Sequence, residues 1–347
     1  MIRFTWLQSR TQTLVAAFVL AALAVVAAIT GIQLSHLYAT LVAHCRTGCD
    51  LATSQYLSHD QVMARALDLI AQAAPALIGL FWGAPLVARE LESGTFRLAW
   101  TQGVTRTRWL VTKLAVAGAA SAAAAGLLSL LVTWWSSPFD KLQANRFSPG
   151  WFDQRGLVPI GYAAFAFALG VTAGVLIRRT LPAMASTVVA FVAARLALTE
   201  WVRPHLAAPA RLAVALDPGR TGFGSTGSGP ETLQPDPPRL ADAWVYSTQV
   251  LDKAGHALTN AFLTKTCPSI GGPAVVNEGS GRTQVPVDKQ HALQDCVARV
   301  SAVYHEVVTY QPASRYWRFQ WYETGLYLAL AVALAGLCVW WVRRRLT

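Results

Sequence analysis

The sequence predicts an all-α membrane protein with six transmembrane helices, both termini cytoplasmic, and a small extracytoplasmic domain between helices 5 and 6. Composition is the first reason: 54% of the 347 residues are hydrophobic and only 14% are charged, whereas soluble domains carry about 25% charged residues. The second is that the apolar residues form runs of about 20, enough to cross a bilayer as a helix. The third is that Arg and Trp residues stand at the ends of these runs, as is typical of spanning segments.

Six apolar runs have the required length. They cover about residues 13–34, 67–91, 110–134, 157–177, 181–202 and 321–342. Residues 1–12 are expected to form a short cytoplasmic segment at the membrane interface. Residues 13–202 then hold helices 1–5 with a cytoplasmic loop at about 88–109, residues 203–320 form the extracytoplasmic domain, and residues 321–347 form helix 6 and a basic tail. Pro75 and Pro85 predict a kink or break in the second span, because proline removes a backbone donor.

Small residues repeat four positions apart in three spans, a spacing that lets helix backbones approach closely in lipid. They are Gly79 and Gly83, then Gly118, Ala122 and Gly126, then Gly170 and Gly174. We interpret these repeats as packing surfaces within the chain.

The net charge of +11 is placed at the ends of the apolar runs. With the N-terminus inside, the short inner segments hold twelve Lys and Arg residues and the short outer loops hold five, which predicts cytoplasmic termini by the positive-inside rule. A nucleic-acid partner is not expected, because it would need basic residues clustered on one face with aromatic residues between them.

The segment from 203 to 320 is polar enough to fold in water. It begins with a loop rich in Gly, Ser and Pro, and we expect helices at about 240–263 and 288–309. Four of the five cysteines fall on the predicted outer side, where disulfides can form, so we expect the pairs Cys267–Cys296 and Cys45–Cys49. Metal binding by His44, Cys45, Cys49 and Asp50 is the alternative for the first outer loop, but the spacing fits no usual zinc pattern.

Motifs for chemistry are missing from the chain. A P-loop requires a Gly-Lys pair, and none occurs. There is also no His-Glu-x-x-His helix and no Gly-x-Ser-x-Gly elbow. We therefore predict no catalytic, cofactor-binding or metal-binding residue, and no enzyme activity in this chain.

The most informative stretch is ARELESGTFRLAWTQGVTRTRWLVTKL, residues 88–114. Its notable elements are, in order, Glu90 and Glu92, Gly94 and Thr95, Leu98, a turn at Gly103, Arg106 or Arg108, and Lys113. This order resembles the cytoplasmic loop of the type-two ABC permeases, the membrane subunits of type V exporters. The sequence departs from the family at the turn, where many relatives carry proline and this chain has Gln102-Gly103. The order of six spans with an outer insert between spans five and six is also similar.

The resemblance implies a permease that works as a dimer with a separate cytoplasmic ABC ATPase, which would hold ATP and Mg. ATPase closure would tilt spans one and two. It also implies a bacterial plasma-membrane location and export of amphipathic molecules such as drugs or antibiotics. The residues expected to couple to the ATPase are Arg89, Glu90, Glu92, Gly94, Thr95, Arg97, Arg106 and Arg108.

Two other functions remain open. A non-transporting sensor would relay ligand binding by the outer domain to a cytoplasmic partner. An intramembrane enzyme would need paired polar residues deep in facing spans, where this chain has mostly Ala, Val, Leu and Gly. For the coupling residues, the charges alone would predict only a solvated inner loop.

Arg195 is the clearest ionisable residue inside a predicted span, where a charge costs about 2.5–3.5 kcal/mol near the membrane centre. Its long side chain could extend to the outer surface. Alternatively it pairs with Glu323 at the start of span six and forms an extracellular gate. Glu200 competes as a partner, although a spacing of five on one helix is poor for pairing.

Overall fold

The computed structural model describes residues 2–43, 45, 49, 52, 55–56, 61–95, 105–140, 146–224, 232–238, 240–267 and 287–345. The chain forms two compact units. The helical unit comprises Met1–Ala207 and Ser314–Thr347, and the sheet unit comprises Ala208–Ala313. These boundaries differ from the predicted 203 and 320, because the helices flanking the sheet unit continue past the ends of their apolar runs.

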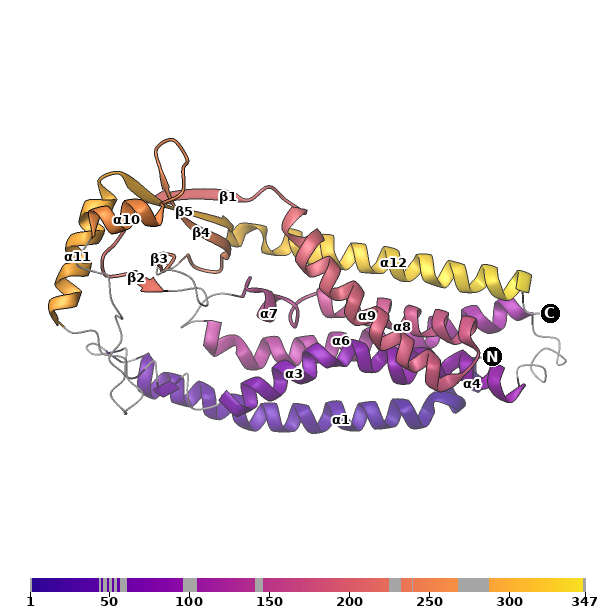
Figure 1. Cartoon of the computed structure of the whole chain (residues 1–347). Helices are drawn as coiled ribbons and strands as arrows, with labels where there is room; N and C mark the ends of the chain where they lie inside the picture. The colour runs from indigo at the N-terminus through magenta and orange to yellow at the C-terminus, as the bar shows by residue number, and fades with distance from the viewer. Residues whose placement is uncertain are drawn as a thin grey trace. The chain divides into compact units, whose positions relative to one another are not determined.

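Six helices in the described part of the chain are long and apolar enough to cross a membrane, which confirms the six-helix prediction. The elements of the helical unit, including π-helical turns η1, η2 and η3, are α1 (Ile2–Leu37), η1 (Tyr38–Val42), α3 (Gln61–Ile78), η2 (Gly79–Gly83), α4 (Ala84–Ser93), α6 (Arg106–Asp140), α7 (Pro149–Phe152), α8 (Val158–Ile177), α9 (Thr180–Ala197), η3 (Leu198–Val202), the 3₁₀ turn η4 (Arg203–His205) and α12 (Tyr316–Arg345). A 3₁₀ turn, η6 (Ala313–Arg315), leads into α12. In Figure 1 the long helices run alongside one another, and α1 begins at the end of the unit where α12 finishes.

The N-terminal segment differs from the prediction. Residues 2–12 are not a separate interfacial piece but the first turns of α1, which is continuous for 36 residues. A helix of that length extends about 54 Å, whereas the hydrocarbon layer is about 30 Å thick. Part of α1 therefore extends beyond the membrane.

The expected break in the second span takes the form of the π-helical turn η2 between α3 and α4. Pro75 lies inside α3, and Pro85 lies in the first turn of α4. Neither proline can donate a backbone hydrogen bond, so the regular α-helical pattern is interrupted here and a wider turn is inserted. The break also exposes backbone to the neighbouring helix α8.

The small-residue repeats of spans two and four pack against each other. A Cβ atom added at Gly79 would lie 2.6 Å from the carbonyl oxygen of Ala166, and one at Gly170 would lie 2.4 Å from the carbonyl oxygen of Gly79. Gly83 and Gly174 make equally close backbone contacts. The packing interpretation is thus confirmed for these four glycines, and α8 is buried on nearly every side because helix backbones can reach it.

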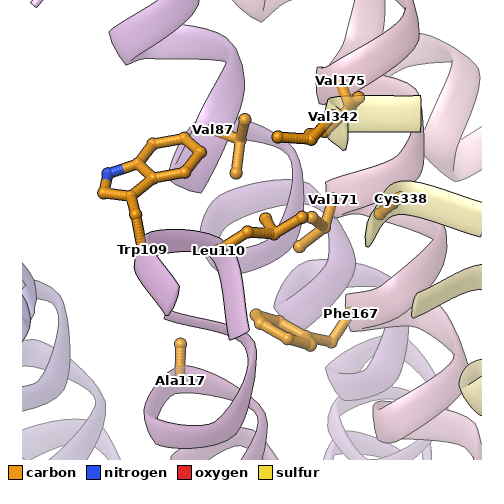
Figure 2. Packing of buried hydrophobic residues seen from close by; sticks show 9 residues of the cluster. All are labelled: Val87, Trp109, Leu110, Ala117, Phe167, Val171, Val175, Cys338 and Val342. Atoms are coloured by element: carbon orange, nitrogen blue, oxygen red, sulfur yellow. The ribbon is translucent and has the colours of Figure 1, made fainter. Parts of the chain in front are cut away.

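One apolar cluster joins four helices of the unit. Figure 2 shows Val87 of α4 and Leu110 of α6 facing Val171 of α8 and Val342 of α12. Trp109, at the start of α6, is fully buried at the edge of this cluster. The first turns of α6 and the end of α4 therefore pack against the helix core.

The sheet unit contains a three-stranded antiparallel sheet of order β1-β5-β4 and a two-stranded sheet of β2 and β3. Its elements are β1 (Ala210–Val214), β2 (Thr221–Gly224), β3 (Thr232–Pro235), β4 (Trp244–Asp252), α10 (Asn260–Thr266), α11 (Val287–Ser301) and β5 (Tyr304–Gln311). The predicted helix at 240–263 is wrong, because the aromatic and β-branched residues in WVYSTQVLD favour a strand. The predicted helix at 288–309 ends at Ser301 and is followed by β5.

Both expected cysteine pairs form disulfides in the structure. Cys267 and Cys296 join the end of α10 to α11 and lie in the apolar core of the sheet unit. Cys45 bonds to Cys49. Their sulfurs are thereby bonded to each other, which argues against the metal alternative for this loop, whose other proposed ligands, His44 and Asp50, lie outside the described residues.

Candidate functional site

The predicted coupling region forms a surface that we call the elbow, residues 88–95 and 105–109. Gly94 ends α4 with φ +73°, a left-handed conformation that favours glycine and turns the chain away from the helix. Thr105 caps the N-terminus of α6, because its hydroxyl accepts a hydrogen bond from the Arg108 backbone nitrogen at 3.3 Å, as an N-cap does. Arg97 lies outside the described residues.

Glu90 does not lie on the surface of the elbow. It is 8% exposed and forms an ion pair with Lys113 of α6. The Lys113 ammonium also lies 4.9 Å from the centre of the Trp109 ring, a cation–π distance. We therefore correct the expected role of Glu90: it joins α4 to α6 inside the protein and is not placed to contact an ATPase directly.

Glu92 is exposed and joins the elbow to span five. Its carboxylate accepts hydrogen bonds from the backbone nitrogen of Thr180 at 3.0 Å and from the Thr180 hydroxyl at 2.6 Å. Thr180 is the first residue of α9, where backbone donors have no partner within the helix and negative charge is favourable. Ala183 of α9 packs beside Ala84 and Ala88 of α4. The elbow is thus attached to α9 as well as to α6.

The remaining coupling candidates stand at or near the surface. Arg89, Thr95 and Arg108 are exposed, and Arg106 is half-buried. The Thr95 hydroxyl lies 3.0 Å from that of Ser93, which helps to fix the turn at Gly94. The described surface of the elbow is therefore mainly cationic.

A second polar site lies among α8, α9, α12 and the loop after α7. We call it the charge cluster: Asp153, Tyr162, Arg195, Arg203 and Glu323. Arg203 donates through Nε and Nη2 to Glu323 at 2.8 and 2.7 Å and also pairs with Asp153. Tyr162 donates its hydroxyl to Glu323 at 2.6 Å. The two cations balance two carboxylates, which makes burial of the cluster tolerable.

The predicted Arg195–Glu323 pair is not present. Arg195 donates to Asp153 at 3.1 Å and to the Gln72 carbonyl oxygen at 3.1 Å, while Glu323 bonds to Arg203. Arg195 and Glu323 belong to one cluster, but Asp153 and Arg203 connect them. Glu200 is exposed and forms no ion pair with Arg195 in this structure, in agreement with their unfavourable spacing.

Sequence reasoning missed Arg203, Asp153 and Tyr162. Arg203 stands just past an apolar run and Asp153 in a polar loop, positions where charges are usually solvated, and Tyr162 resembles an ordinary interfacial aromatic. The available signal was Gln320, Glu323 and Thr324 near the start of span six, because several polar groups in an apolar run require partners. Among the described residues, no three His, Cys, Asp or Glu side chains come together to hold a metal.

Residues 17–203 match the model of a protein family described as ABC-2 membrane transporter related. The chain belongs to this family. No match was found among the curated proteins or among the solved structures. The ABC-2 match covers spans one to five with the elbow and ends at Arg203, so the sheet unit and α12 lie beyond it. The protein is a multi-pass membrane protein and a permease component of an ABC-type transporter, in a family that generally works with an ATPase subunit.

Proposed function

We propose that this chain is the permease subunit of an ATP-driven exporter in a bacterial plasma membrane, with both termini cytoplasmic. A separate ATPase subunit binds the elbow, and a second copy of the permease completes the translocation pathway. ATP and Mg are held by the ATPase. The elbow carries the proposal: its exposed cationic surface is attached to α6 through Glu90 and Lys113 and to α9 through Glu92 and Thr180.

The proposed cargo is an amphipathic small molecule such as a drug or antibiotic. A groove of about 600 Å³ lies between α1 and α6 beside Trp82, within the size range of small-molecule sites. Its lining is almost wholly apolar and includes Ala21, Ala24, Ala120 and Ala124. Small alanine side chains leave room for a guest, and the absence of charge suits the apolar part of an amphipathic molecule.

Transport into inside-out vesicles tests this function. The chain is reconstituted with the ATPase that co-purifies with it, and ATP-dependent uptake of a fluorescent amphipathic dye is measured. Ala21 lines the groove, and its neighbour Ala22 is also exposed but does not line it. Ala21→Trp should reduce uptake at least fivefold by filling the groove, whereas Ala22→Trp should leave uptake unchanged.

Two results would contradict the proposal. Equal uptake by the two variants would exclude the groove as the cargo site. The sensor function would be favoured by a second result. The wild-type complex would move no dye in a panel of cationic, neutral and anionic amphipathic molecules, while ligand binding to the sheet unit changed ATPase activity.

A further inference from the structure

Two arginines bracket a break in span five. The helix α9 ends at Ala197, and the chain continues through the π-helical turn η3, which closes with a hydrogen bond from the Arg203 nitrogen to the Leu198 carbonyl oxygen. Such turns are rare and are places where a helix can bend. Arg195 lies before η3 and Arg203 directly after it, so the two cations hold different sides of the same break.

The two sides are held with very different strength. Arg203 is 2% exposed and is bonded to Glu323, Asp153 and the Tyr162 hydroxyl. Tyr162 and Glu323 belong to α8 and α12, whose backbones are in close contact where a Cβ at Gly161 would lie 3.2 Å from Thr324. The segment after η3 is therefore fixed to the central helices.

The body of α9 is held only lightly. The Arg195 side chain is 16% exposed, forms an ion pair with Asp153 at 3.1 Å, donates to a backbone oxygen of α3, and lies 4.8 Å from the centre of the Tyr162 ring. Apart from Arg195, α9 buries few side chains, namely Ala183, Thr187 and Phe191, whereas α8 is buried along most of its length. The α9 body therefore has fewer buried contacts to lose on moving than α8 has.

The far end of α9 is attached to the elbow. Glu92 accepts hydrogen bonds from both donors of Thr180, and Ala183 packs beside Ala84 and Ala88 of α4. In Figure 1, α9 runs beside α8, with its first turn near α4. A displacement of the elbow is therefore delivered to the end of α9 that lies farthest from η3.

We propose that α9 is a lever that pivots at η3: Glu92 moves its first turn, Arg203 fixes its pivot, and the Arg195–Asp153 ion pair holds it in the position seen here. Glu92, Arg195 and Arg203 are positioning residues for the transport step and do not contact cargo. This inference rests on the proposed function, because the ATPase supplies the displacement. It adds span five to the movements that the family resemblance assigns to spans one and two.

The hold of the Arg195–Asp153 ion pair on α9 can be tested on the full chain alone, in lipid nanodiscs and without any ATPase. Nitroxide labels at Val189→Cys on α9 and Val332→Cys on α12, both exposed, report their separation by double electron–electron resonance in a Cys338→Ser background. Arg195→Gln should at least double the width of the distance distribution. Arg195→Lys, which keeps the positive charge, should leave the width as in the wild type. A control pair at Leu176→Cys of α8 and Val332→Cys should not change. An unchanged α9 distribution in Arg195→Gln would overturn the lever.

The link to the elbow is tested in the complex with its co-purified ATPase. ATP with vanadate should shift the Val189–Val332 distance in the wild type. Thr180→Pro should abolish the shift, because proline removes both Thr180 donors. The helix should tolerate this change, because proline is accepted at the first position of a helix and the preceding Arg179 already has the extended conformation that precedes proline. This variant leaves the elbow surface untouched. Glu92→Leu should also abolish the shift, whereas Glu92→Gln, which still accepts hydrogen bonds, should keep it.

The outcomes separate the lever from the proposed function. A full ATP-dependent shift and full dye uptake in Thr180→Pro would overturn the lever and leave the exporter intact. A broadened α9 distribution in Arg195→Gln, in a chain that binds no ATPase, would support the Arg195–Asp153 hold on α9 and contradict the exporter.

Discussion

Removing one partner of the Glu90–Lys113 ion pair should lower the free energy of unfolding more than removing both partners. Their side chains are 10% and 1% exposed, so replacing one partner removes the opposite charge that offsets the cost of burying the other. Breaking a buried pair costs about 3–5 kcal/mol, or roughly a hundredfold to several-thousandfold in the folding equilibrium. Replacing both partners by apolar residues of similar size should be close to neutral.

The free energies of unfolding of four proteins are compared: the wild type, Glu90→Leu, Lys113→Met and the double variant. Unfolding of the full chain is followed by tryptophan fluorescence during denaturant titration in mixed micelles. Each single variant should lose about 3–5 kcal/mol, and the double variant should recover most of that loss. Arg89→Leu, an exposed change on the same helix, is the control and should have a small effect. Additive losses in the double variant, or single losses below about 1 kcal/mol, the upper range for exposed pairs, would refute the reasoning.

Three further predictions concern packing, the disulfide and pH. Gly170→Ala should destabilise the helical unit by about 1–3 kcal/mol in the same titration, because the added Cβ would lie 2.4 Å from a backbone atom. Gly126→Ala should have little effect, because its Cβ would meet only a side chain at 3.5 Å. Equal effects of the two variants would contradict the described packing. Cys267→Ser should cost the sheet unit about 3–4 kcal/mol for a loop of 29 residues, seen as faster amide exchange in α11; unchanged exchange would contradict it. Burial raises the pKa of Glu306 in β5, so the folded state binds this proton more tightly than the unfolded chain does, and stability falls as pH rises through the folded pKa. Amide exchange of β4 and β5 should show this loss of stability. The loss should disappear in Glu306→Gln, and its persistence there would show that another group causes it.

The spans could be predicted from the sequence because lipid imposes a strong constraint: every backbone group must bond within its own helix, so apolar runs of fixed length become helices. The π-helical turns were less predictable. Pro75 and Pro85 signalled a break at η2. Before η3 the only proline of the same helix is Pro182, in the first turn of α9 and far from the break, and Pro204 follows the turn. The strand β4 was missed because a polar segment in water can be either helix or strand, and its pairing with β5 lies some sixty residues away in the chain.

The site residues were predicted by type better than by partner. Glu90 and Glu92 look equivalent in the sequence, two positions apart on one short helix. Two positions on an α-helix point to different faces, so one carboxylate is buried against Lys113 and the other meets Thr180. In the charge cluster, Arg195 was recognised from its place in an apolar run, whereas Asp153 could only be assigned once loop and helix were seen together.

The central claim is that an ATPase binds the exposed cations of the elbow. The most direct measurement isolates the full chain from native membranes and determines the ATP hydrolysis that co-purifies with it. The wild type is compared with Arg89→Glu/Arg108→Glu and with Arg65→Glu, which changes another exposed arginine, on α3 outside the elbow. The account predicts that the wild type and Arg65→Glu retain full ATP hydrolysis and that the elbow variant loses it at least tenfold. Undiminished hydrolysis with the elbow variant, or none with the wild type, would contradict it.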